Sequence, residues 1–168
     1  MSGTVGMATL VRLILRRDRV RLPLWVLGGV GLSAASAAAV RGTYDTPEEL
    51  RTYATTAGDS AASRITSGRQ VALDTLGGVV ANEITLTATL GVTLMAVFTV
   101  VRHTRAEEES GAAELLRSGV LGRHAAALAA VTVAVGASLI VGALHTAVLV
   151  SIDLDPAGSV AYGAAVAL

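Results

Sequence analysis

The sequence predicts an all-α membrane protein: a polytopic helical bundle with three complete transmembrane helices, the start of a fourth, and an N-terminal interfacial helix. Hydrophobic residues make up 52% of the 168 residues and charged residues only 15%, which is too apolar for an ordinary soluble domain. Small and branched aliphatic residues dominate, with 31 Ala, 18 Gly and a single Phe. Three uncharged stretches are also long enough to cross a bilayer.

These stretches cover residues 22–40, 84–101 and 125–151. As α-helices they would measure about 28, 27 and 40 Å, against roughly 30 Å of hydrocarbon, so the third must tilt or protrude. A fourth apolar stretch, 157–168, is too short to span before the chain stops. We interpret it as the start of a fourth helix that is cut within the given sequence, and the alternative is a short re-entrant or interfacial terminus.

Arginine density predicts the orientation of these spans. Residues 1–21 contain five Arg, residues 102–124 contain four, and the longer connection 41–83 also contains four. By the positive-inside rule, the N-terminus and the 102–124 connection are cytoplasmic, whereas 41–83 is extracytoplasmic. An alternative for the first span is a secretory signal, but the stretch is longer than usual signal cores.

The composition excludes several functions. Thirteen Arg balance thirteen acidic residues, so no basic excess supports binding to nucleic acid. The absence of Cys excludes disulfides, thiolate metal sites and cysteine nucleophiles, and we expect no metal or other cofactor. Lys is also absent while Ala and Arg are abundant, which is typical of a high-GC bacterial genome and places the protein in a bacterial cell membrane.

Residues 7–21 form a predicted amphipathic helix on the inner membrane surface, and Pro23 would allow the turn into the first span. The alternative is a plain positively charged anchor. The polar face would carry Arg12, Arg16 and Arg19, and the apolar face Leu10, Val11, Ile14 and Leu15.

In the 41–83 connection, Thr46, Pro47 and Glu49 have the spacing of a capping box, which predicts a short helix continuing to Ala57. Residues 58–68 are rich in Ser, Thr and Gly and predict a loop. Nothing in this connection has catalytic spacing.

The third span has small residues at every fourth position, a ridge that would let another helix approach closely, although chance could produce it in an Ala-rich chain. The ridge comprises Ala126, Ala130, Ala134, Ser138, Gly142 and Thr146. His145, its one ionisable residue, is expected to be buried and hydrogen-bonded or interfacial, in preference to a proton relay.

The 102–124 connection contains Glu107, Glu108 and Glu109, followed by a segment that is apolar on one side. We interpret the acids as the start of a helix, where its dipole favours negative charge. Such a helix could bind a cytoplasmic partner. The alternative is a solvated loop, and the spacing does not distinguish the two.

A resemblance adds to this interpretation. The run from Val101 to Glu109, followed by Gly111 and residues 114–116, resembles ABC-2 type permeases, and bacterial polyketide and tetronasin-type antibiotic exporters in particular. Residues 13–19 and 22–25 share the likeness. Family permeases are longer, which implies that this chain is an N-terminal portion.

In that family, the connection after the second span contains a coupling helix that contacts a separate ATP-binding cassette subunit. The resemblance implies this role for Glu107, Glu108, Glu109, Gly111, Glu114 and Leu115. One departure is Ala112, where the family often has Arg.

The favoured function is therefore the membrane subunit of an ATP-driven exporter of antibiotics or other amphiphilic small molecules. The chain itself is not expected to be an enzyme, because without Lys it cannot form the phosphate-binding loop of ATPases. The first alternative is a non-transporting membrane scaffold that uses the small-residue ridge for helix assembly. The second, an intramembrane enzyme, lacks a catalytic pair in the spans.

Overall fold

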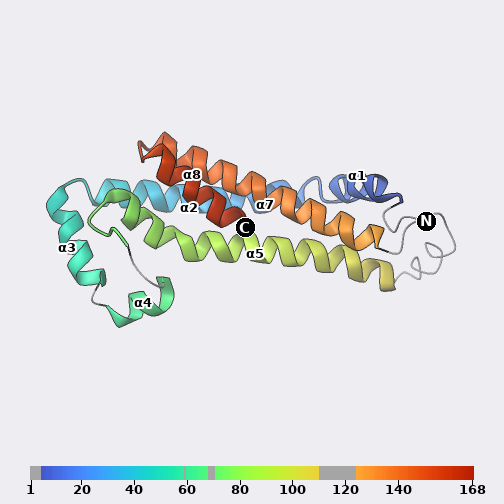
Figure 1. Cartoon of the computed structure of the whole chain (residues 1–168), viewed down its shortest axis with the longest axis horizontal. Coiled ribbons are helices and arrows are strands. Elements are labelled where there is room, and N and C mark those ends of the chain that lie inside the picture. The colour runs from blue at the N-terminus through green and yellow to red at the C-terminus, as the bar shows by residue number, and fades with distance from the viewer. Residues whose placement is uncertain (1–4, 59, 68–70, 110–123) are drawn as a thin grey trace.

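The computed structural model describes residues 5–58, 60–67, 71–109 and 124–168, and within these ranges the chain forms helices and no strand. Figure 1 shows three long helices running lengthwise, with two short helices at one end and the N-terminal helix at the other. In chain order the helices are α1 (Met7–Arg17), α2 (Arg21–Thr43), α3 (Pro47–Gly58), α4 (Ala61–Ser67), α5 (Leu76–Glu109), α7 (Ala125–Ser151) and α8 (Pro156–Ala167).

Three helices are long and apolar enough to cross a membrane: α2, α7 and the part of α5 from Leu76 to Arg105. The predicted all-α membrane bundle is thereby confirmed. Helix α7 has the bounds predicted from its uncharged stretch, and α8 begins one residue before the predicted fourth stretch. The prediction of 22–40 for α2 was short by a few residues.

The predicted span 84–101 lies inside a longer helix, because α5 has 34 residues and extends beyond the span at both ends. The span was predicted from the uncharged stretch, which is bounded by the charged residues Glu83 and Arg102. A helix can continue past such residues where their side chains have partners. Glu83 accepts a hydrogen bond from the Tyr53 hydroxyl, and Arg102 lies beside Asp18.

The amphipathic helix predicted for residues 7–21 ends early, at Arg17, so Arg19 does not lie on its polar face. An elbow of three residues, 18–20, joins α1 to α2. The turn therefore precedes Pro23, which occupies the third position of α2. Proline is tolerated there, because the first four N–H groups of a helix have no intrahelical acceptor.

Helix α7 lies at the centre of the bundle. Of its most apolar window, 44% is buried, against 28% for α2 and 22% for α5, and it packs against α1, α2, α5 and α8. The core around it combines alanines of α7, such as Ala129 and Ala130, with larger aliphatic side chains such as Val26. Ile14 of α1 is buried in the same core, whereas Arg12 and Arg16 are exposed, so α1 has the predicted two faces. Its position relative to a bilayer stays a prediction.

The C-terminal part of the predicted small-residue ridge, Gly142 and Thr146, packs against α8. A Cβ atom at Gly142 would collide with the Gly163 carbonyl oxygen, and one at Gly163 would collide with the Thr146 hydroxyl and the Gly142 carbonyl. Only glycine allows this approach of the two backbones. The Thr146 hydroxyl also donates to the Ser159 carbonyl oxygen, at 3.2 Å, which adds a polar contact between the helices.

At the end of the bundle that contains α3 and α4, the predicted capping box is confirmed. Glu49 Oε2 accepts from the N–H of Thr46 at 2.9 Å, and Thr46 Oγ1 accepts from the N–H of Glu49 at 3.3 Å. These hydrogen bonds lower the pKa of Glu49, with the Thr46 backbone bond as the largest cause. The prediction of a loop over 58–68 is wrong, because α4 occupies Ala61–Ser67.

Candidate functional site

The structure places the predicted coupling residues at the end of α5 or beyond it. Glu107, Glu108 and Glu109 form the last residues of α5, whereas Gly111, Glu114 and Leu115 lie outside the described residues. The interpretation that the three acids begin a helix is wrong, since they end one. There the negative end of the helix dipole disfavours carboxylates.

One turn before these acids, α5 contacts the α1–α2 elbow through a buried ionic cluster. The Asp18 side chain is 2% exposed, and its Oδ2 lies 2.6 Å from Nε2 of His103, which is 7% exposed. The two side chains therefore lie at hydrogen-bond distance. Arg102 Nε lies 3.7 Å from Asp18 Oδ1, an ion pair longer than a hydrogen bond.

The backbone holds Asp18 at this position. Its N–H donates to the carbonyl of Ile14 at 2.9 Å, which closes α1, and its own carbonyl accepts from the N–H of Leu22 at 2.9 Å, which opens α2. Asp18, within the elbow, is therefore hydrogen-bonded through its backbone to both helices. A movement of α5 at His103 would act directly on the junction of α1 and α2.

The buried cluster is costly to break. Removing Asp18 would leave the buried His103 ring without its hydrogen-bond partner, and an unsatisfied buried group typically costs about 1–3 kcal/mol. Oδ1 of Asp18 has no hydrogen-bond partner among the described residues, so its charge is balanced by Arg102 without direct hydrogen bonding. The side chains of Asp18, Arg102 and His103 therefore connect the elbow to α5.

Sequence reasoning did not find this cluster. Asp18 and His103 are 85 residues apart, and the second span was predicted to end at Val101, just before Arg102 and His103. The sequence did contain one signal that distinguishes Asp18. Asp18 is the sole acidic residue among the first 44, and it stands between Arg17 and Arg19.

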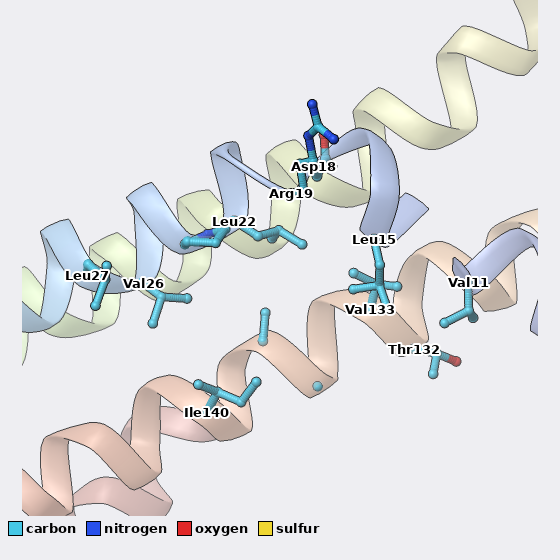
Figure 2. A pocket seen from close by; sticks show the side chains of 13 residues that line it. Val11, Leu15, Asp18, Arg19, Leu22, Val26, Leu27, Thr132, Val133 and Ile140 are labelled. Atoms are coloured by element: carbon cyan, nitrogen blue, oxygen red, sulfur yellow. The ribbon is translucent and has the colours of Figure 1, made fainter. Parts of the chain in front are cut away.

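Next to the elbow lies an apolar groove of about 570 Å³, which we call the α7 groove. Figure 2 shows α1 and α2 on one side of it, with Leu15, Leu22 and Val26, and α7 on the other, with Val133 and Ile140. The lining is apolar except for Asp18, Arg19 and Thr132. Its volume falls within the range of small-molecule sites, about 300–1,000 Å³.

His145 of α7 is buried, as predicted, and hydrogen-bonded. Its Nδ1 lies 2.9 Å from the carbonyl oxygen of Val141, and its ring lies 6.2 Å from that of Tyr162, measured between centroids. Among the described residues, no group of three acidic or histidine side chains is placed to hold a metal ion. His145 therefore has the surroundings of a packed core residue.

The chain is similar to part of a known membrane permease. The chain is 42% identical over 167 residues to a multidrug efflux system permease protein of Mycobacterium tuberculosis. The match covers 99% of this chain and 30% of that permease. No family model matches the sequence. The chain is thus a helical membrane protein similar over nearly its whole length to part of an efflux permease.

Proposed function

We propose that this chain belongs to the membrane subunit of an ATP-driven exporter of antibiotics or other amphiphilic small molecules, in a bacterial cell membrane. The observation that carries the proposal is the 42% identity to a multidrug efflux permease across 99% of the chain, together with three helices able to span a bilayer.

Energy would come from a separate ATP-binding cassette subunit. The chain contains no Lys, and the phosphate-binding loop of such ATPases requires one to contact the β- and γ-phosphates. The membrane subunit would then hydrolyse nothing itself. Its part would be to convert movement of the partner into movement of its helices.

The end of α5 suits contact with that partner. Glu107, Glu108 and Glu109 are the last residues of α5, at the negative end of its helix dipole. Arg or Lys side chains of a partner would neutralise them. Leu115, which follows in the sequence, would supply the apolar anchor, because anchors of this kind contribute most of the binding energy at interfaces.

The buried cluster gives a route from this contact into the bundle. His103 lies one helical turn before Glu107, and it holds Asp18 at the α1–α2 elbow. A partner that moves the end of α5 would therefore reposition α1 and α2, which line the α7 groove together with α7. That groove is apolar and of a size suited to part of an amphiphilic molecule.

The orientation proposed from the arginine counts has residues 1–21 and 102–124 in the cytoplasm. The fold is compatible with it, because α1 and the end of α5 share one end of the bundle while α3 and α4 lie at the other (Figure 1). Single cysteines at Ser60 and Ser110 should react oppositely with a membrane-impermeant reagent. Equal labelling from outside would refute the orientation.

The coupling proposal is tested with Leu115→Asp and Glu108→Ala in the permease co-expressed with its ATP-binding subunit. Leu115→Asp should reduce both co-purification of that subunit and drug resistance, because it removes an apolar anchor while membrane insertion stays intact. Glu108→Ala removes one of several charges at an exposed rim and should change little. Normal co-purification and resistance with Leu115→Asp would refute the coupling role of this segment.

The scaffold alternative has weaker support. It relied on the small-residue ridge of α7 as a surface for assembly with other helices. That ridge is already covered within the chain, since Gly142 and Thr146 contact Gly163 and Ser159 of α8.

A further inference from the structure

A second groove, between α2 and α5, combines an arginine-rich end with an apolar floor. It has a volume of about 670 Å³, and we call it the α5 groove. Arg17, Arg21 and Arg102 lie at one end of it. Its lining along α2 continues through Leu24 and Trp25 to Leu32, so polar and apolar surfaces meet within one site.

The arginine end has an excess of positive charge. The one acidic residue of the lining is Asp18, which is already engaged by His103 and Arg102. Within the described part of the chain, neither Arg17 nor Arg21 forms an ion pair. Three arginines facing one aspartate leave two positive charges at the mouth of the groove.

The length of the groove matches one leaflet of a bilayer. Leu32 lies eleven residues beyond Arg21 on α2, and Gly91 lies eleven residues before Arg102 on the antiparallel α5. Eleven residues of α-helix extend about 16 Å. Half of the hydrocarbon thickness of a bilayer is roughly 15 Å.

Glycines form the floor of the groove without any internal packing that requires them. A Cβ atom at Gly28, Gly29 or Gly91 would meet no other protein atom within 4 Å. Each glycine in a helix costs roughly 0.5–1 kcal/mol relative to alanine. The lack of side chains at these three positions leaves the groove open along the helix surface. This differs from Gly142 and Gly163, where backbone contact fills the space.

We propose that the α5 groove binds an anionic phospholipid. Its phosphate would contact Arg17, Arg21 and Arg102, and one acyl chain would lie between α2 and α5 over the glycine floor. Arginine suits this role, because its planar, permanently charged guanidinium binds phosphate oxygens in a bidentate manner. The proposal requires that the helices span a bilayer, and it does not depend on export activity.

Trp25 gives a direct probe, because it lines the groove and is the single tryptophan of the chain. The chain is reconstituted in phosphatidylcholine vesicles that contain either brominated phosphatidylglycerol or brominated phosphatidylcholine at equal mole fraction. Bromine quenches tryptophan fluorescence on contact. We expect phosphatidylglycerol to associate at least fivefold more strongly, since one arginine near an anionic surface contributes about that factor.

Two matched pairs of variants test the location. The double variant Arg17→Gln, Arg21→Gln should abolish the preference for phosphatidylglycerol. Its control, Arg12→Gln with Arg16→Gln, removes the same charge from exposed positions of α1 outside the groove and should retain that preference. Gly28→Leu fills the groove and should reduce quenching by several-fold. Gly31→Leu, at an exposed glycine of α2 outside the groove, should not.

Three results would overturn the proposal. Equal quenching by the two brominated lipids would show that the arginines do not select a headgroup. Equal loss of selectivity in both arginine pairs would show general surface attraction without a site. If neither brominated lipid quenches the fluorescence of Trp25, protein covers the groove.

Discussion

The two ends of the bundle are both held by pairs of polar and charged side chains, but the pairs differ in burial. At the α1 end, Asp18 and His103 are 2% and 7% exposed. At the α3 end, Arg41 binds Asp153 at 3.1 Å with the two side chains 41% and 85% exposed. Burial determines the energy, because exposed pairs typically contribute about 0–1 kcal/mol while breaking a buried pair costs several times more.

This contrast fits a division of roles. The α3 end is held by several small, independent contacts: the capping box, the Arg41–Asp153 pair and the hydrogen bonds of Tyr53 to Glu83 and Asn82. Losing one of them should leave the others in place. At the α1 end, one buried cluster joins three segments, so a change there should affect the elbow and α5 together.

The largest effect is expected for Asp18→Ala. This substitution leaves His103 buried without its hydrogen-bond partner, while the half-exposed Arg102 can be solvated by water, and should lower the free energy of unfolding by up to about 3 kcal/mol. Thermal unfolding in detergent micelles measures it. The matched control is Asp153→Ala, which breaks the exposed pair and should change stability by less than about 1 kcal/mol. Equal losses in the two variants would remove the contrast between the ends.

Gly163→Val should have the next largest effect. Its Cβ would collide with backbone and side-chain atoms of α7, which forces α8 away and should cost about 1–3 kcal/mol. Gly136→Val is the control, because a Cβ at Gly136 meets nothing within 4 Å. The same unfolding assay compares them, and a neutral Gly163→Val would show that α7 and α8 are not in close contact.

A smaller effect is expected for Tyr53→Phe, which removes hydrogen bonds to Glu83 and Asn82 and should cost about 1.5 kcal/mol. Burial and the hydrogen bond to Glu83 raise the pKa of Tyr53 to about 12. The folded state thus favours the protonated phenol. The resulting stability is fully present below the unfolded pKa of about 10 and is lost as the pH rises toward 12.

The pH dependence provides the control for this variant. Stability profiles of the native chain and Tyr53→Phe, measured from pH 8 to 12, should converge above pH 10. Parallel profiles across that range would show that burial and the hydrogen bond to Glu83 do not raise the pKa of Tyr53.

The smallest effect is expected for Thr46→Ala, which removes one half of the capping box of the exposed helix α3 and should cost at most about 1 kcal/mol. Because the pKa of Glu49 is lowered, its contribution is present above its ordinary value of 4.5 and fades as the pH falls below it. Hydrogen exchange of the α3 amides at pH 7 and pH 4 measures the change. Identical exchange in the variant and the native chain at pH 7 would contradict the cap.

Local signals accounted for most of the fold. The 27 uncharged residues of α7 gave its bounds, and Thr46 with Glu49 gave the start of α3, because both depend on neighbouring residues alone. The bounds of α5 could not be obtained this way. Its charged ends are stabilised by Tyr53 and Asp18, which are distant in the sequence.

The candidate site was less accessible to sequence reasoning. The coupling residues followed from a resemblance, and half of them lie outside the described residues. The Asp18–His103 pair forms because the chain turns after Arg17. The arginine spacing across residues 12–19 fits a continuous helix, so the sequence pattern did not indicate this turn. The contacts between segments across the bundle depend on long-range packing, which local sequence patterns do not reveal.

The central claim is that the buried Asp18–His103 pair transmits movement of α5 to the α1–α2 elbow, and Asp18→Asn in the permease tests it most directly. Asparagine keeps the size of the side chain but removes the charge that holds Arg102 and His103. With membrane abundance matched to the native protein, co-purification of the ATP-binding subunit should be unchanged while drug resistance falls at least tenfold. Native resistance in the Asp18→Asn variant would contradict the claim.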